Sequence, residues 1–251
     1  AIERRAKNDI AVTDADFPIS RSYIAMLSET GATPVVQSKW FATVVVESPD
    51  STVAEQLQQL AIVDSVKWIW KGNLRVPAEE KREDRFVSED EPLHNEYGYS
   101  YKQIKMLNGT KLHEAGFRGE GMRVAVIDAG FMNADRVSAF DSLRLLGTHN
   151  VVFPGKSVFV GDDHGTKVLS CLAADIPGVM VGTAPKASYL LLKSEDSDSE
   201  YPVEEDYWTA AVEYADSAGV DVISSSLGYF AFDTDELSYD QDALDGRTAM
   251  I

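Results

Sequence analysis

The chain has 251 residues, 44% of them hydrophobic, and 41 acidic against 23 basic side chains give a net charge of −18. This charge argues against nucleic acid and anionic membrane as partners. No apolar run approaches the roughly 18 residues that a membrane span needs. A single cysteine, Cys171, excludes an internal disulfide, and we expect it to be a small core residue. The length allows two modest domains or one large one.

The first part of the chain alternates short helices and strands after a polar start at residues 1–18. Hydrophobic periodicity and turn residues predict a helix at 20–31, strands at 33–38 and 40–47, a helix at 52–61 that opens with a capping box, and a strand at 65–70. One further strand in front would complete the β-α-β-β-α-β order of a ferredoxin-like α+β domain. A generic α+β accessory domain is the alternative.

Residues 72–95 mark the clearest domain boundary. They are dense in charged residues, contain two prolines and show no sustained apolar periodicity, which is the composition of a linker. We therefore divide the chain into a first domain at 1–71, a linker at 72–95 and a second domain at 96–251. Any protease would find the linker the easiest backbone to cut.

The second domain alternates strands with helices, which predicts an α/β fold with a parallel sheet. The expected elements are an interrupted helix at 102–116, a strand at 122–127, a short strand at 151–153, a helix after His164, a strand at 187–192, a helix at 203–218 and a strand at 220–225. His113 and His149 are interpreted as structural, with His113 solvated or locally paired. The loop 131–147 is interpreted as solvated surface.

Asp128 and His164 are the candidate catalytic residues. Asp128 follows the buried strand, and His164 stands just before a helix, so both belong to the carboxyl edge where open α/β sheets place their active sites. A buried carboxylate can orient an imidazole and stabilise the imidazolium that forms when the ring takes a proton. The helix N-terminus should in turn disfavour that cation and keep the resting histidine neutral. Either residue alone would be a weak signal.

Four segments resemble the motifs of the subtilisin-like serine peptidases. VAVIDAGF resembles the Asp motif, HGTKVLSCLAA the His motif, GTAPKASYLLLK at 182–193 the G-x-A-P segment and its strand, and VDVISSSLGY at 220–229 the strand that lines the substrate cleft. The resemblance implies a truncated subtilisin-like parallel sheet flanked by helices, serine endopeptidase activity and a polypeptide substrate. It assigns Ser226, Leu227 and Gly228 to substrate binding by strand pairing.

The same resemblance extends to the first domain, whose pattern is similar to the inhibitory propeptide of these peptidases. It implies that the chain binds its own propeptide, that maturation cleavage falls in or near the linker, and that the protein is secreted or in the cell envelope. The resemblance implies no cofactor.

The resemblance stops short of the nucleophile. No G-T-S motif and no oxyanion Asn follow the S-L-G segment, and Ser224, Ser225 and Ser226 end a strand, so they are poor candidates. We expect the serine to lie beyond Ile251 and this chain alone to be inactive. The alternatives are a catalytically inactive peptide-binding pseudoprotease and a folding or inhibitory module. A nucleotide-binding domain is disfavoured, since no G-x-G-x-x-G follows the VAVID strand.

Three groups of acidic residues leave their roles open. Asp162 and Asp163 before the His helix could raise the basicity of His164, bind a cation or simply favour the helix N-terminus. The segment 194–206 is a solvated loop or an acidic rim that favours basic substrate residues. The segment 233–246 lacks the ligand spacing of an EF-hand, so we expect no metal site, with calcium as the remaining possibility.

Overall fold

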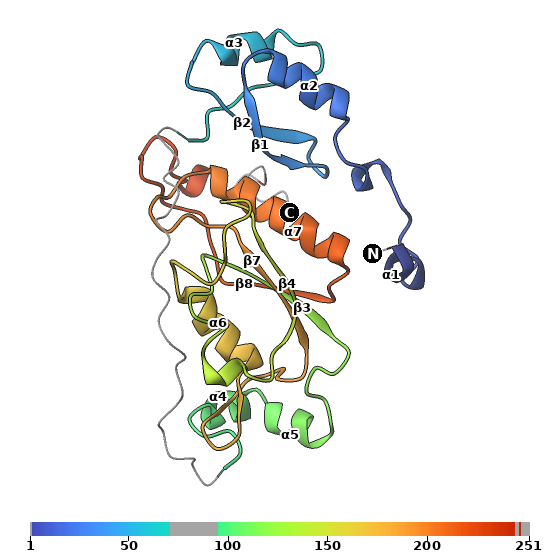
Figure 1. Cartoon of the computed structure of the whole chain (residues 1–251), viewed down its shortest axis with the longest axis vertical. Helices are drawn as coiled ribbons and strands as arrows, with labels where there is room; N and C mark the ends of the chain where they lie inside the picture. The colour runs from blue at the N-terminus through green and yellow to red at the C-terminus, as the bar shows by residue number, and fades with distance from the viewer. Residues whose placement is uncertain (1, 71–94, 244–245, 247–251) are drawn as a thin grey trace. The chain divides into compact units, whose positions relative to one another are not determined.

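The computed structural model describes residues 2–70, 95–243 and 246, which fall into two compact units (Figure 1). The first unit combines residues 1–74, 198–217 and 228–251, and the second combines 75–197 and 218–227. The predicted linker, except its last residue, lies outside the described residues. Among those described, no helix is both long and apolar enough to cross a membrane.

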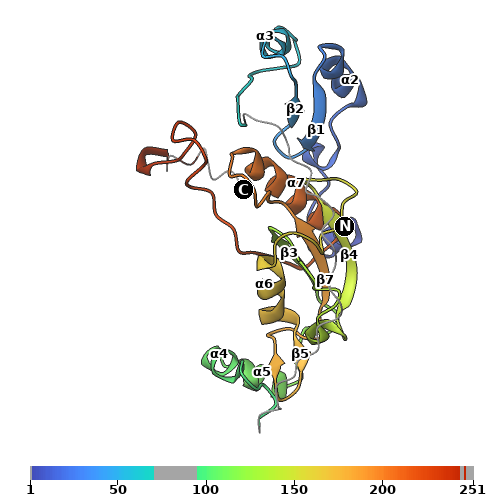
Figure 2. The same ribbon diagram turned by 60° about the vertical axis from the view of Figure 1, so that its left-hand side comes forward.

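The N-terminal part of the first unit is an antiparallel hairpin covered by two helices. Its elements are α1 (Ile2–Lys7), η1 (Asp14–Asp16), α2 (Arg21–Glu29), β1 (Thr33–Ser38), β2 (Thr43–Glu47) and α3 (Val53–Gln58). Val44 and Val46 alternate along β2 and pack against Leu27 of α2 and Leu57 of α3. Figure 2 shows both helices beside the hairpin. These contacts bury Leu27 and Leu57, whereas Tyr23 of the predicted apolar face of α2 is 47% exposed.

Two predicted features of this part are wrong. Residues 65–70 form no strand, and Val66 and Trp68 are 37% and 51% exposed. A β-branched and aromatic run becomes a strand only where a neighbouring backbone is free to pair with it; here the Val66 amide donates to the Gln58 side chain instead. The predicted capping box at Thr52 is also absent, because Asp50 Oδ1 accepts the Thr52 amide at 2.9 Å.

A parallel sheet of four strands organises the second unit. The strands β3 (Arg123–Asp128), β4 (Arg144–Asn150), β7 (Ser188–Lys193) and β8 (Val222–Ser225) lie in the order β4-β7-β3-β8. Along the chain, the helix α6 (His164–Ala173) lies between β4 and β7, and α7 (Val203–Ala218) lies between β7 and β8. This succession confirms the predicted α/β class. Ala125, Val126 and Ile127 of β3 are fully buried, as expected for a central parallel strand.

The sequence prediction misplaced one strand of this sheet. Residues 151–153 are buried but irregular, whereas β4 at 144–150 lies within and just beyond the loop that was interpreted as solvated surface. The pairing of β4 with β7 shifts register between Leu145 and Gly147. A bulged, half-exposed edge strand carries no continuous apolar run, so its sequence did not show the signal of a buried strand.

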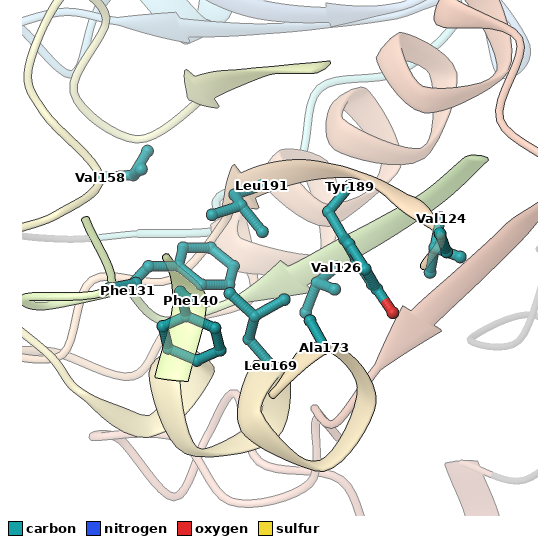
Figure 3. Close-up of a cluster of buried hydrophobic side chains, with 11 residues drawn as sticks. Val124, Val126, Phe131, Phe140, Val158, Leu169, Ala173, Tyr189 and Leu191 are labelled. Atoms are coloured by element: carbon teal, nitrogen blue, oxygen red, sulfur yellow. The ribbon is translucent and has the colours of Figure 1, made fainter. Parts of the chain in front are cut away.

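One hydrophobic cluster joins the sheet to α6 (Figure 3). Leu169 and Ala173, one turn apart on α6, point toward Val126 of β3 in the view, and Leu191 of β7 completes the contact. Leu169 and Leu191 are fully buried. Burying a leucine contributes about 2 kcal/mol, so this cluster fixes the beginning of α6 against the end of β3.

The remaining elements of the second unit are short. They are η2 (Ser138–Phe140), β5 (Asp175–Ile176), β6 (Met180–Val181), α4 (Tyr101–Met106) and α5 (Gly109–Glu114), and the first unit adds η3 (Gln241–Ala243). The predicted interruption between α4 and α5 is confirmed, since Asn108 adopts the left-handed conformation with φ of 56°. His113 of α5 is buried rather than solvated, and it bonds to the Tyr97 hydroxyl and the Thr183 carbonyl.

Candidate active site

Asp128 ends the central strand of the sheet. In the strand register it lies level with Lys193 of β7, which in turn lies level with Asn150 of β4. The three polar residues each end a strand, so polar side chains meet at the carboxyl edge of the sheet. The Asp128 side chain is fully buried there.

His164 begins α6 and bonds directly to Asp128. Its Nδ1 donates to Asp128 Oδ1 at 2.7 Å, and the same oxygen accepts the amide of Ala129 at 2.8 Å. Asp128 Oδ2 is buried with no hydrogen-bond partner in the described part of the chain. The His164 side chain is 51% exposed, so its Nε2 is left for other partners. The structure therefore brings the two predicted residues together as a buried acceptor and an accessible imidazole.

The two groups shift each other's protonation. Burial raises the pKa of Asp128, and the His164 hydrogen bond offsets part of that rise. The hydrogen bond and charge of Asp128 raise the pKa of His164 above its ordinary 6.5. We expected the helix N-terminus to disfavour the imidazolium; the contact with Asp128 outweighs it, because a carboxylate in direct hydrogen-bond contact acts more strongly than the partial charge of a helix end.

A glycine permits the close approach of α6 to β3. A Cβ at Gly165 would lie 2.4 Å from the Gly130 carbonyl oxygen and 2.8 Å from Asp128 Cβ. Real Cβ atoms do not approach backbone so closely, so only glycine fits directly after the histidine. The His-Gly order of the sequence was a signal for this contact, which the sequence analysis did not use.

The two acids before the histidine make different contacts. Asp162 Oδ1 accepts the His164 amide at 2.6 Å, and Asp163 pairs with Lys167 at 2.7 Å, four residues along α6. Asp162 therefore satisfies an amide at the helix N-terminus, and its charge also contributes to the raised pKa of His164. Cation binding by these acids stays a prediction. The thiol of Cys171 is exposed on the same helix, so its prediction as a core residue is wrong. At position 171 the helix turns away from the cluster that buries Leu169.

Lys193 is a polar residue of this edge that the sequence analysis missed. It is buried at the end of β7, and its Nζ donates to the Ala129 carbonyl, the first residue after Asp128. The next amide, from Ser194, donates to the Asp128 carbonyl at 3.1 Å. A lysine ending an apolar strand that pairs with the Asp128 strand was the available signal. These bonds hold the turn that aims the carboxylate.

Ser226, Leu227 and Gly228 follow β8 along the chain. Their strand pairs with β3, with Ser225 opposite Ile127, so the segment leaves the sheet at the same carboxyl edge. Ser226 and Gly228 are exposed, and a Cβ built at Gly228 meets no atom within 4 Å. Their assignment to substrate binding stays a prediction.

The acidic stretch 194–206 is not uniformly solvated. In the second unit Glu195 is buried and accepts a hydrogen bond from Ser194. In the first unit Glu204 of α7 is 1% exposed, and burial raises the pKa of Asp206 to about 6. The prediction of a solvated loop fails for these residues, because local composition does not show which side chains tertiary packing covers. The acidic rim hypothesis stays a prediction.

The buried face of α7 includes a carboxylate. Val203, Tyr207 and Ala211 are buried, but Tyr214 is 41% exposed. Glu213, one position earlier, is 8% exposed and takes its place facing the hairpin. Its Oε1 accepts the Ser38 hydroxyl at 2.6 Å and the Trp40 amide at 3.1 Å, and its Oε2 accepts the Lys39 amide at 3.1 Å. One carboxylate therefore holds the whole turn between β1 and β2.

The fold and the pair define the class of the protein: an α/β protein with a hydrogen-bonded Asp–His pair at the carboxyl edge of a parallel sheet. Comparison with known proteins gives the family. A family model described as "Peptidase S8 propeptide domain, Bacteroidota" matches residues 1–85. Subtilisin E of Bacillus subtilis (strain 168) is 32% identical over 147 residues, which are 57% of this chain and 36% of that protein.

Two further relatives agree. The major intracellular serine protease of Bacillus subtilis (strain 168) is 31% identical over 133 residues, 50% of this chain and 40% of that protein. Fervidolysin from Fervidobacterium pennivorans, a keratinolytic enzyme related to subtilisin, shares the fold over 88% of this chain and 35% of its own, with a TM-score of 0.55 and 15% identity.

These matches support a subtilisin-like serine peptidase, a subtilase, with an N-terminal propeptide domain. It spans 36% to 40% of the length of the two Bacillus relatives.

Proposed function

We propose that this chain supplies the acid–base half of a serine endopeptidase, with Asp128 and His164 as two members of an Asp-His-Ser triad. The observation that carries the proposal is the 2.7 Å bond from His164 Nδ1 to the fully buried Asp128. It fixes the imidazole so that Nε2, on the opposite side of the ring, is available to a nucleophile. Orientation of the histidine by a buried carboxylate is what such a triad requires.

In this mechanism His164 Nε2 takes the proton of a serine hydroxyl as the oxygen attacks the peptide carbonyl. Asp128 stabilises the resulting imidazolium, which then gives the proton to the leaving amine. A water molecule, activated by the same nitrogen, hydrolyses the acyl-enzyme. The proposal draws the serine and the oxyanion Asn from polypeptide beyond Ile251, because Ser224–Ser226 belong to a strand end and the Bacillus relatives are longer.

The substrate in this proposal is a polypeptide that pairs with the segment Ser226–Gly228. An extended peptide gains main-chain hydrogen bonds at such an edge, and the open space at Gly228 leaves room for it. The N-terminal domain serves as the inhibitory propeptide, docked through Glu213 to the turn Ser38–Trp40. We further propose a secreted or cell-envelope protein that needs no organic cofactor; cell fractionation tests the location.

A reactive serine-directed phosphonate tests the proposal on the protein as its organism makes it. We expect the intact natural protein to have a mass above 27.6 kDa and to take up the label covalently. His164→Ala should abolish labelling, since the phosphonate reacts with a serine activated by the base. Cys171→Ala is the matched control, because Cys171 is exposed on the same helix two turns away.

Two outcomes would contradict the proposal. An unlabelled natural product of 27.6 kDa would favour the peptide-binding pseudoprotease or the inhibitory module. Labelling that survives His164→Ala would assign the base to another residue.

A further inference from the structure

Two carboxylates on α7 face the N-terminal part of the first unit. Glu213 holds the hairpin turn, and Asp216 lies three residues further on. Residues three apart on a helix share a face, so the two carboxylates form one acidic strip along it. Glu213 accepts main-chain amides, which nearly any sequence can offer. Asp216 binds a side chain, which makes its contact dependent on sequence.

That side chain is Arg5 of α1. Its guanidinium donates to Asp216 Oδ2 at 2.9 Å and also pairs with Asp16 of η1. The Arg5 side chain is only 18% exposed, and Asp216 is 34% exposed. Asp16 in turn accepts the Thr13 amide at 2.8 Å. One arginine therefore closes the segment 2–17 on itself and ties it to α7.

A cation would stabilise the C-terminal end of α7. Its last turn contains no basic residue, while its terminal carbonyls and Asp216 are all negative. Arg5 brings a fixed positive charge to that end, and the planar guanidinium can serve two carboxylates at once. Burial lowers the pKa of Arg5, yet bonding to Asp16 and Asp216 more than offsets this and leaves the pKa raised.

We propose that residues 2–17 form a clamp of the propeptide, separate from its hairpin and helices, and that Arg5 and Asp216 make it specific for this chain's own α7. Glu213 supplies a contact that any propeptide backbone can make, and Arg5–Asp216 supplies the contact that a propeptide lacking the arginine cannot. The inhibitory meaning of the clamp rests on the proposed function; the docking itself does not, and the experiment measures docking.

Hydrogen exchange read by mass spectrometry tests the clamp in the full chain. Arg5→Ala and Asp216→Ala should each speed exchange in the peptide covering residues 2–17 by roughly threefold to tenfold. The double variant should exchange no faster than Arg5→Ala alone, because Asp216→Ala removes a bond that the arginine substitution has already removed. The charge-swapped pair Arg5→Asp with Asp216→Arg should recover part of the protection.

Asp14→Ala is the matched control. The substitution removes a charge from η1, the short helix that also contains Asp16. The Asp14 side chain makes none of the contacts described above that tie the segment to α7. It should leave the exchange of residues 2–17 within about twofold of the parent chain. Unchanged exchange in Asp216→Ala would overturn the proposal, whatever the proteolytic activity, and would assign Arg5 to Asp16 alone.

Discussion

Acidic residues stand at the start of both long helices, but they lie in different environments at α6 and at α7. Asp162 and Asp163 precede α6, and Glu204, Glu205 and Asp206 open α7. The acids of α6 are partly exposed: Asp162 accepts the His164 amide, and Asp163 pairs with a lysine. Those of α7 are wholly or partly buried, and burial raises the pKa of both Glu205 and Asp206.

The difference shows that acidic residues at a helix start predict the helix but not its electrostatics. At α6 the acids leave the first turn open around His164, whose side chain is half exposed. At α7 burial raises the pKa of Glu205 and Asp206, so these carboxylates take up protons at a higher pH than exposed ones do. Each of the following predictions changes one side of this contrast.

The largest expected effect concerns the histidine at the start of α6. His164→Ala in the full-length protein should lower turnover on the order of a millionfold, the scale on which a triad histidine acts in subtilisin. Asp128→Asn should lower it about ten-thousandfold, because the imidazole loses its orienting acceptor. Turnover of a chromogenic peptide measures both. Equal and small losses in the two variants would mean that the pair does not act as a base.

The next largest effect is expected at Gly165, whose missing side chain lets α6 pack closely against β3. Gly165→Ala should destabilise the second unit by about 1–3 kcal/mol or more, since its Cβ would overlap the Gly130 carbonyl and Asp128. Chemical denaturation measures the loss. Gly228→Ala is the control: with nothing within 4 Å of the new Cβ, stability should change by less than about 0.5 kcal/mol. A tolerated Gly165→Ala would show that α6 can shift away from β3.

On the side of α7, Glu213→Ala should destabilise the first unit by about 2–3 kcal/mol. It leaves the Ser38 hydroxyl and the amides of Lys39 and Trp40 without their charged acceptor. Unfolding of the unit by urea gives the value. Glu29→Ala, at an exposed position of α2, is the control. Equal stability of the two variants would remove Glu213 as the anchor of the hairpin turn.

A smaller effect follows from the pKa of about 6 for Asp206. The folded state then binds a proton that the unfolded state, with an ordinary value of 3.8, releases earlier, so stability falls as pH rises from about 4 to about 6. The loss attributable to this group is at most about 2–3 kcal/mol. Asp206→Asn should flatten the dependence. Identical slopes for variant and parent in urea unfolding at several pH values would contradict the burial argument.

The sequence was enough to predict what local patterns determine. The apolar run before Asp128 predicted a central strand, and the apolar residues after His164 predicted a helix start. Parallel strands share one carboxyl edge, so the meeting of Asp128 and His164 followed from their positions alone. The break between α4 and α5 followed from Asn-Gly for the same local reason.

What failed depends on tertiary partners. The strand-like residues 65–70 have no pairing partner, β4 was hidden by a bulge, and Cys171 faces outward although its neighbours are apolar. The roles of Lys193 and Glu213 were also missed. A buried ion is recognisable only through the groups that it bonds, and those lie far away in the sequence.

The central claim is that Asp128 stabilises the imidazolium of His164, and the pKa of His164 tests it most directly. Nitrogen-detected NMR titration of the chain should give a value above 6.5, with Nδ1 protonated in the neutral form. In Asp128→Asn the value should fall toward or below 6.5, and the neutral, base-competent form should then appear at lower pH. A His164 pKa that is the same in both proteins would contradict the account.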